Sequence, residues 1–333
     1  MPRYRSWLPC LFVVVALGCS GPFPQTTLAP RSDFGGAIQD LFGGIFWWAV
    51  VVFAVVEGLL LYAIIRYRRR PGAPEPKATH GHTVLEIAWT LAPALILVFI
   101  AVPTVRTIFR TAGTAPAGSG ALRVQVIGHQ WWWEFRYPDH GVVTANELHL
   151  PVGRPVALEM SSADVIHSFW APGLGGKRDV IQGRTTRLAF TPDSVGTYAG
   201  QCAEFCGLSH ANMRLSVVVE PDAAFSAWVG RQQAGPAPAA RGSLEERGGQ
   251  LFARSACAGC HTIEGVSRGL IGPNLTHVGS RATIASGLYP NTPDHLARWI
   301  ADAPALKPGS LMMTMALPPD DLRALVAYLR SLK

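Results

Sequence analysis

The chain has 333 residues, of which 49% are hydrophobic and only 15% charged, and its formal net charge is +7. This length fits two or three domains, and a charged share well under the usual figure of about 25% indicates that part of the chain lies in lipid. Basic residues cluster beside an apolar run and not along a soluble face, which argues against nucleic-acid binding. These residues are Arg66, Arg68, Arg69, Arg70 and Lys77.

Residues 1–19 are predicted to form a secretory signal peptide. Arg3 and Arg5 precede an apolar run, Leu11 to Leu17, that is too short to span a membrane. The following ALGCSG resembles the cleavage site of bacterial lipoproteins, which would make Cys19 the lipidated first residue of the mature chain. Ordinary cleavage nearby, without a lipid, is an equal alternative.

Residues 35–110 are predicted to form a transmembrane hairpin. The two spans, 45–65 and 87–105, are apolar and long enough for membrane helices, and the prolines inside the second span are tolerated there. The basic loop between the spans should face the cytoplasm, so both ends of the chain should lie outside. Glu57, within the first span, should face protein because a charge in lipid is costly.

The pattern changes after the hairpin. Residues 121–222 contain short, often alternating runs rich in β-branched and aromatic residues, which predicts an all-β sandwich. A linker rich in proline, alanine and glycine follows at 230–243. Residues 244–333 are predicted to form a small all-α domain, whose last helix has apolar residues at helical spacing. The expected fold class is therefore multidomain.

The segment QCAEFCGLSHANM holds several metal-binding side chains. Cys202, Cys206 and His210 are spaced four apart, and Met213 follows three residues later. Two thiolates, an imidazole and a thioether form a soft set of ligands that favours copper, zinc or an iron–sulfur cluster. Copper electron-transfer sites also use methionine as a weak axial ligand, which favours copper here.

A copper site of this kind takes another histidine from a distant loop. His167, in SADVIHSFW, is the candidate, and on composition alone it has three rivals in the same region. The rivals are His129, His140 and His149. Spacing alone also leaves a Cys202–Cys206 disulfide or a structural zinc site open.

The motif CAGCH, from Cys257 to His261, is the attachment signature of a c-type haem. In such a site Cys257 and Cys260 form thioethers with the haem and His261 is an axial iron ligand. The exported region, a preceding helix and the following IGPNL turn are similar to a class I cytochrome c. This context favours haem over a disulfide.

The second axial ligand of this haem should be a methionine, which raises the reduction potential. The segment LKPGSLMMTMALPPDD offers three candidates before the last helix. Met312 fits the spacing of the cytochrome family best, and Met313 and Met315 are its rivals.

Four segments together resemble cytochrome c oxidase subunit II, in order, over roughly residues 35–222. CAEFCGLSHANM resembles the loop that holds its binuclear copper centre, CuA, and SSADVIHSFWAPGLGGKRDVIQGR resembles its upstream histidine segment. IGHQWWWEF resembles its aromatic segment, and LEIAWTLAPALILVFIAVP its second membrane helix. The resemblance implies a cupredoxin-like sandwich, followed here by a fused cytochrome c domain.

The resemblance also implies roles for residues of the site. Cys202 and Cys206 would bridge both coppers, and His167 and His210 would each bind one copper. The weak ligands would be Met213 and the backbone carbonyl of Glu204, whose side chain would reach a magnesium or manganese ion at the border with subunit I.

Two further roles follow from the same resemblance. Trp131 matches the tryptophan through which electrons enter the copper site. Glu86, just before the second span, matches the glutamate at the mouth of a proton pathway into subunit I, although a simple interfacial carboxylate is the alternative.

The function implied is that of subunit II of a bacterial haem–copper oxidase in the plasma membrane, with both soluble domains on the periplasmic side. Electrons from a cytochrome c or a bc-type complex would pass through haem c and CuA to subunit I. Oxygen would be reduced to water there, with proton pumping, and subunit III would be a further partner. The near-balanced charges of the two soluble domains leave the donor open.

Two alternatives come from other classes of protein. One is a copper and haem c subunit of a nitrous oxide or nitric oxide reductase. The other is a structural subunit without redox function, as in quinol oxidases whose subunit II has lost its copper; the intact set of ligands argues against it.

Overall fold

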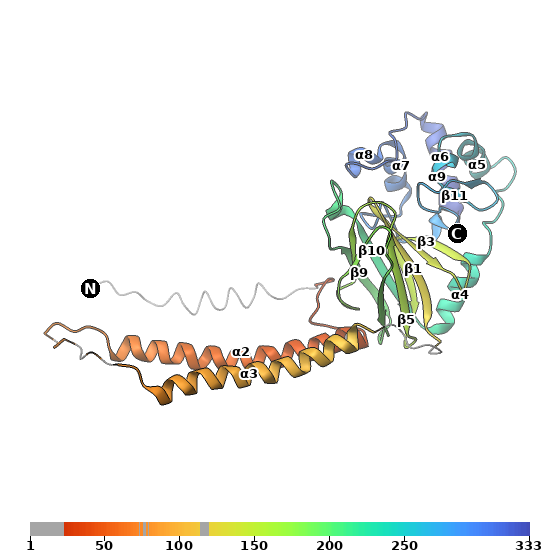
Figure 1. Ribbon diagram of the computed structural model, residues 1–333. Coiled ribbons are helices and arrows are strands. Elements are labelled where there is room, and N and C mark those ends of the chain that lie inside the picture. Colours follow the sequence, from red (N-terminus) through yellow and green to blue (C-terminus); the bar gives the residue numbers. More distant parts are fainter. Residues whose placement is uncertain (1–22, 73, 76–77, 79, 114–119) are drawn as a thin grey trace.

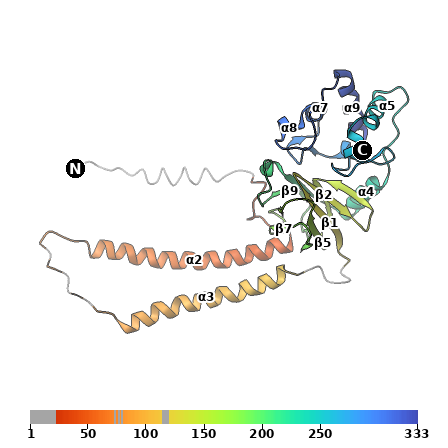
Figure 2. The ribbon, with the colours of Figure 1, turned by 45° about the horizontal axis from the view of Figure 1, so that its top comes forward.

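The computed structural model describes residues 23–72, 74–75, 78, 80–113 and 120–333; the predicted signal peptide, with Cys19, lies outside them. The chain forms a helical hairpin, a two-sheet β-sandwich and a small helical domain, in that order (Figure 1). The multidomain fold class predicted from the sequence is confirmed. The C-terminal domain lies on the side of the sandwich that faces away from the hairpin (Figure 1, Figure 2).

The hairpin consists of α2 (Asp33–Arg66) and α3 (Thr83–Thr111), and both helices are long and apolar enough to cross a membrane. They extend past the predicted spans, 45–65 and 87–105, because each helix continues through the more polar residues that flank its apolar run. The ring of Trp48 in α2 stacks on the ring of Phe99 in α3, with centroids 6.1 Å apart. Most residues of both helices are exposed, as expected for helices that face lipid or other subunits.

The start of α2 is attached to the sandwich. Ser32 caps the helix by accepting a hydrogen bond from the Gly35 amide, and its hydroxyl donates to the carbonyl of Leu174. Asp33 Oδ1 accepts a 2.7 Å hydrogen bond from the Thr191 amide. These contacts fix the sandwich at the end of the hairpin that lies away from the basic loop (Figure 1).

The sandwich contains two five-stranded sheets. The first has the order β3 (Val142–Ala145), β2 (Trp132–Tyr137), β1 (Leu122–His129), β5 (Val156–Ser162) and β8 (Thr186–Phe190). The second has the order β4 (Glu147–Pro151), β10 (Arg214–Glu220), β9 (Gly196–Cys202), β6 (His167–Trp170) and β7 (Arg178–Val180). Alternate residues are buried along β1, β5 and β10, so one face of each strand contributes to the core between the sheets.

Helix α4 (Asp222–Gln233) follows the last strand of the sandwich and packs on it. Its Phe225 and Trp228 are buried, and the Trp228 ring stacks on His149 of β4 at 4.3 Å. The helix therefore includes residues 230–233, which the sequence assigned to the linker. Proline at its cap position and two apolar side chains one turn apart stabilise the helix against the sheet, and the linker begins after it.

The C-terminal domain is built around three longer helices, α5 (Leu244–Arg254), α7 (Pro293–Ala301) and α9 (Pro319–Ser331). Short elements connect them: α6 (Cys257–Cys260), β11 (Thr262–Ile263), β12 (Ser267–Arg268), η2 (Val278–Ser280), β13 (Thr283–Ile284), β14 (Tyr289–Pro290) and α8 (Ala303–Leu306). The core contains the buried faces of the helices, including Phe252, Leu296 and Leu325. The two-stranded hairpins are the only departure from an all-α domain within its residues, all of which the structure describes.

Candidate metal centres

The connection between β9 and β10 forms the first site, and we call residues 202–213 the ligand loop. Cys202 is the last residue of β9, and Met213 directly precedes β10. The amide of Cys202 donates a 2.9 Å hydrogen bond to the carbonyl of Met213, so the antiparallel ladder closes the loop at its base. Within the loop, η1 (His210–Asn212) makes a short helical turn. Both ends of the loop are therefore fixed by the sheet.

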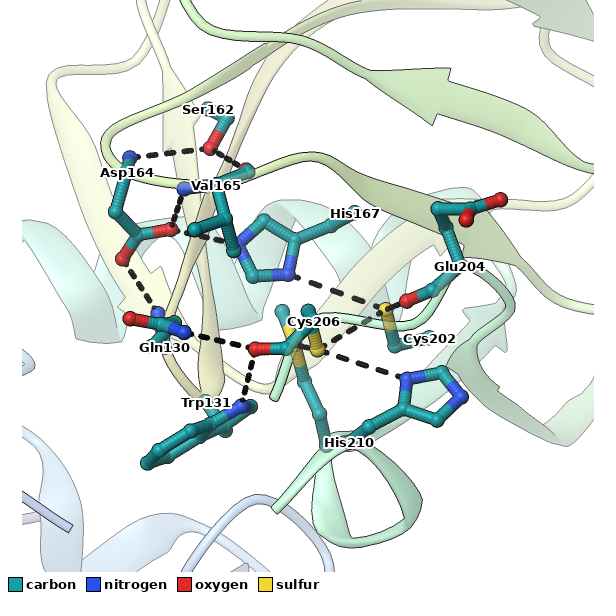
Figure 3. A network of polar contacts seen from close by, with 11 residues as sticks. Gln130, Trp131, Ser162, Asp164, Val165, His167, Cys202, Glu204, Cys206 and His210 are labelled. Atoms are coloured by element: carbon teal, nitrogen blue, oxygen red, sulfur yellow. Dashed lines mark hydrogen bonds and ion pairs between the residues drawn. The ribbon is translucent and has the colours of Figure 1, made fainter. Parts of the chain in front are cut away.

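The two thiols of the ligand loop face each other. The sulfur atoms of Cys202 and Cys206 lie 3.8 Å apart, and each residue is only 3% exposed. This separation is far greater than the disulfide bond length of about 2.05 Å, and both cysteines are free. His210 Nδ1 lies 3.5 Å from the Cys206 sulfur (Figure 3). The arrangement favours a metal site over the disulfide that the spacing left open.

His167 approaches the same thiols from β6. Its Nδ1 lies 3.9 Å from the Cys202 sulfur, and its ligand atoms lie within 4.8 Å of those of both cysteines. Nε2 makes a 2.7 Å contact with Asp164 Oδ1, which leaves Nδ1 facing the sulfurs (Figure 3). Two neighbouring strands of the second sheet, β6 and β9, thus bring His167 and Cys202 together.

The three rival histidines have other surroundings. His129 stacks on Trp132 with ring centroids 4.1 Å apart and contacts Glu134, and His149 stacks on Trp228. His140 packs edge-on against Phe225 of α4. The structure brings none of the three into the group formed by His167 and the thiols.

Two weaker donors complete the surroundings of the thiols. The thioether sulfur of Met213 lies 3.8 Å from the Cys206 sulfur, and Met213 is fully buried. The backbone oxygen of Glu204 lies 3.2 Å from the Cys202 sulfur. Figure 3 shows the carboxylate of Glu204 pointing away from the sulfurs. The six donors predicted from the sequence therefore converge, and their softness fits copper.

Protons in this group are shared unequally between its members. The contact with Cys206 lowers the pKa of Cys202, and the same contact raises the pKa of Cys206. Burial disfavours the charged form of His167, but its bonds to Asp164 and Cys202 outweigh burial and raise its pKa. Thiolates and neutral imidazole are the forms that bind metal, so metal uptake would release protons from this group.

Two donors outside the ligand loop hold its position. Gln130 Nε2 and Trp131 Nε1 donate to the carbonyl oxygen of Cys206, at 2.8 and 2.9 Å (Figure 3). Trp131 is 8% exposed, and the next tryptophan but one, Trp133, is fully buried in the core against Phe169. Trp131 belongs to the same buried cluster as Trp133, but unlike Trp133 it also contacts the ligand loop through its indole nitrogen.

The second site is a cavity of about 250 Å³ that is lined mainly by the C-terminal domain and also by residues of the sandwich, including Trp131. Its walls include both thiols of the CAGCH motif, which α6 carries, together with His261 and Met312. His261 Nδ1 lies 2.9 Å from the carbonyl oxygen of Pro273, which leaves Nε2 as the free nitrogen. A Cβ atom at Gly272 would lie 2.4 Å from the His261 ring, so only glycine fits this wall. Two thiols, an oriented imidazole and a thioether fit a covalently bound haem.

The three candidate methionines are not equivalent. Met312 lines the cavity and packs partly buried against the core of the domain. Met313 and Met315 also line the cavity, but Met313 is 59% exposed. Burial thus favours Met312 over Met313, and Met315 remains a rival.

Sequence analysis missed three residues of these sites. Asp164 orients His167, and its position three residues upstream was a signal that could have been used. Gln130 donates a hydrogen bond to the ligand loop, and Lys307 lines the cavity where the two domains meet. A single glutamine or lysine carries no local pattern, so only the tertiary structure identifies them.

Glu86 lies apart from both metal sites. It occupies the first turn of α3, at the end of the hairpin that lies far from the sandwich (Figure 1). Glu86 is exposed. This position fits a role at the opposite end of the membrane span from the ligand loop.

The hairpin, the sandwich and the C-terminal domain each match a known protein family. Residues 32–107 match the transmembrane domain of cytochrome c oxidase subunit II, and residues 140–220 match its periplasmic domain. Residues 245–333 match cytochrome c. A cytochrome c oxidase subunit 2 from Alkalihalophilus pseudofirmus is 37% identical over 98% of this chain and 96% of that relative. The chain belongs to the cytochrome c oxidase subunit II family. It is thus a membrane-bound subunit of an oxidoreductase complex, and its families imply copper and haem cofactors.

Other relatives differ in how much of the chain they cover. Cytochrome c oxidase subunit 2 of Bacillus subtilis is 33% identical over 98% of this chain and 96% of that relative. Quinol oxidase subunit 2 of Bacillus spizizenii is 34% identical over 68% of this chain and 71% of that relative. The crystal structure of the periplasmic domain of subunit II from Bradyrhizobium japonicum is 31% identical, covers 36% of this chain and 97% of that chain, and has a TM-score of 0.34.

Replacing Asp164 with asparagine should weaken copper binding by roughly 10- to 100-fold, because the charged partner that orients a ligating histidine is lost. The measurement is copper retained by the full-length subunit at graded concentrations of a chelator, followed by near-infrared absorption. Asp179→Asn, at an exposed position of the same domain, is the matched control. Equal copper affinity in the two variants would contradict the role given to Asp164.

Replacing Met312 with alanine should abolish the methionine-to-iron absorption band and make the haem reduction potential more negative, because a thioether ligand raises that potential. Met315→Ala, at the rival position, should leave both unchanged. The opposite pattern would assign the ligand to Met315.

Proposed function

We propose that this subunit is an electron relay, which accepts electrons at a haem c and delivers them through a CuA centre to subunit I. The observation that carries the proposal is the convergence of five residues of the ligand loop with His167, beside a cavity lined by Cys257, Cys260, His261 and Met312. Subunit I would reduce oxygen to water and pump protons. The external donor would be a cytochrome c or a bc-type complex.

In this proposal His167 and each donor of the ligand loop have separate roles. Cys202 and Cys206 would be shared by both coppers, while His167 and His210 would each bind one. Met213 and the carbonyl of Glu204 are the weak ligands, one for each copper. A bridged copper pair supplies one-electron exchange with little change in geometry, and the sheet holds its ligands in the same positions for both redox states.

The C-terminal domain holds the haem in a complementary way. Cys257 and Cys260 attach it covalently, and His261 and Met312 bind its iron. The bond from Pro273 to His261 supports this assignment, since it fixes the tautomer and orientation that an axial ligand needs. Apolar walls that include Phe252 and Leu296 exclude water from the iron.

Further roles concern partners beyond this chain. The carboxylate of Glu204, free of the thiols, would bind magnesium or manganese at the contact with subunit I. The hairpin would lie in lipid against subunits I and III, with the sandwich and the cytochrome domain on the outer, periplasmic side. The position of the basic residues at the end of the hairpin opposite to both domains supports this orientation.

Relatives named quinol oxidase subunit 2 raise the alternative of a subunit without copper. The complete set of donors in the ligand loop and the CAGCH motif argue against that alternative. The match over the transmembrane and periplasmic domains of oxidase subunit II argues likewise against a nitrous oxide or nitric oxide reductase partner.

Metal analysis of the purified oxidase complex tests the relay directly. The complex should carry two CuA coppers and one covalent haem for each copy of this chain, in addition to the metals of subunit I. A Cys206→Ser variant should lose the CuA absorption and fall to background turnover, while its covalent haem remains. A complex that turns over at the normal rate without CuA or without haem c would contradict the proposal.

Replacing Glu86 with glutamine should slow turnover severalfold without changing copper or haem content, because a proton-carrying carboxylate is removed from the entrance of a pathway. Glu75→Gln, in the loop before α3, is the control. Turnover equal to that of the unmodified complex would leave Glu86 as a simple interfacial carboxylate.

A further inference from the structure

The sandwich and the cytochrome domain meet at a buried amine. Lys307 is only 4% exposed, although lysine is almost never fully buried without partners. Its Nζ donates to the carbonyl of Trp131 at 2.6 Å, to Ser286 Oγ at 2.9 Å and to the carbonyl of Ala285 at 3.3 Å. The Ser286 hydroxyl donates to the same Trp131 carbonyl at 2.8 Å. Two side chains of the cytochrome domain thus converge on one backbone oxygen of the sandwich.

Burial lowers the pKa of Lys307 to about 7. Neutral or protonated, the amine carries enough N–H groups to reach the Trp131 carbonyl, so the contact does not require its charge. A buried polar group is stabilised only while its partners are present. If the domains separated, water would replace the Trp131 oxygen as the partner of Lys307. Burial of the amine therefore costs free energy, which its hydrogen bond to Trp131 offsets only in the docked position.

The residues after Lys307 enclose the ring of Trp131. Gly309 has a φ of +83°, which favours glycine, and a Cβ atom there would lie 2.5 Å from the indole ring. Between them, the carbonyl of Pro308 accepts a 2.6 Å hydrogen bond from Ser209 Oγ, in the ligand loop. This short segment, 307–309, therefore contacts both the tryptophan and the ligand loop, three residues before Met312.

Trp131 connects the two sites. Its indole lines the haem cavity together with Cys260 and Met312. Its Nε1 donates at 2.9 Å to the carbonyl of Cys206. A single side chain thus runs from the wall of one site to the backbone of a bridging cysteine in the other.

Two more hydrogen bonds cross the same contact. The Thr283 amide donates to Glu147 Oε1 at 3.0 Å, and the Arg214 amide donates to the Ser286 carbonyl at 3.2 Å. Both amides thus donate across the domain boundary. Their protection from hydrogen exchange therefore reports docking, independently of any metal or haem.

We propose that Lys307 and Gly309 are positioning residues, which hold the cytochrome domain against Trp131 so that electrons pass between the two sites in one docked geometry. The inference rests on the proposed relay for its redox part. In each transfer a haem held in the cavity would give up one electron, and copper held by the ligand loop and His167 would accept it. No bond is made or broken, and no proton is required.

The test uses the full-length subunit within the oxidase complex. Lys307→Met keeps a similar side-chain volume but removes every N–H donor. We expect the Thr283 and Arg214 amides to exchange about tenfold faster or more, because a buried hydrogen bond is lost. The haem absorption, the CuA absorption and the rate at which a small-molecule reductant reduces CuA directly should stay unchanged.

Transfer from haem c to CuA, started by a light pulse, should slow by roughly tenfold or more in Lys307→Met, because small displacements of the reacting groups change rates strongly. Lys333→Met, an exposed change in the same domain, should match the unmodified complex in every measurement. A Gly309→Val variant, which places a side chain against Trp131, should reproduce the slow transfer and the fast exchange. If Lys307→Met fails to fold, the same measurements on Gly309→Val test the proposal.

The outcomes separate the two proposals. Unchanged exchange and unchanged transfer in both variants, beside normal transfer in the unmodified complex, would overturn the positioning role. An unmodified complex that carries both centres but transfers no electron from haem c to CuA would overturn the relay instead, and the exchange of the two amides would still decide whether Lys307 docks the domains.

Discussion

The two thiols of Cys202 and Cys206 face each other because the β9–β10 ladder leaves them no other position. The ladder closes at the Cys202–Met213 hydrogen bond, and the carbonyl of Cys206 accepts donors from Gln130 and Trp131. Backbone pairing on one side and side-chain donors on the other therefore fix the loop. A site that exchanges electrons benefits from such rigidity, since ligands that do not move add little reorganisation to each transfer.

This rigidity continues in both directions from the loop. Towards the membrane, Ser32 and Asp33 tie the start of α2 to the sandwich. On the opposite side, Lys307 ties the cytochrome domain to Trp131. The proposed copper site thus lies between a membrane anchor and a haem domain that are both attached to the same sheets. Its distances to the two neighbouring redox partners would be set by the fold.

Much of this organisation could be predicted from the sequence, because its signals are local. Five of the six proposed copper ligands lie within one segment of twelve residues, 202–213, and the haem motif is five residues long. His167 needed the family resemblance, since three other histidines had equal claims by composition. The two helices begin and end close to the bounds of the predicted hairpin, 35–110, and extend beyond its apolar spans because hydropathy marks the apolar run and not the caps. The linker was begun too early for a related reason, as α4 is stabilised by tertiary packing of Trp228 on the sheet. Lys307 could not be predicted at all, because its partners are two backbone oxygens and a hydroxyl distant in the chain.

The path of the chain between the two soluble domains has a consequence for assembly. His277 Nε2 contacts the carbonyl of Gln232 near the end of α4, at 3.1 Å, so the cytochrome domain holds the point from which the linker departs. With its start fixed and its end leading into α5, the linker does not need to swing for the domains to meet. The linker instead fixes the ratio of the two domains, because one translated chain contains one cytochrome domain and one sandwich. The supply of that domain is then matched to the number of oxidases made, whatever the abundance of free cytochromes in the same compartment.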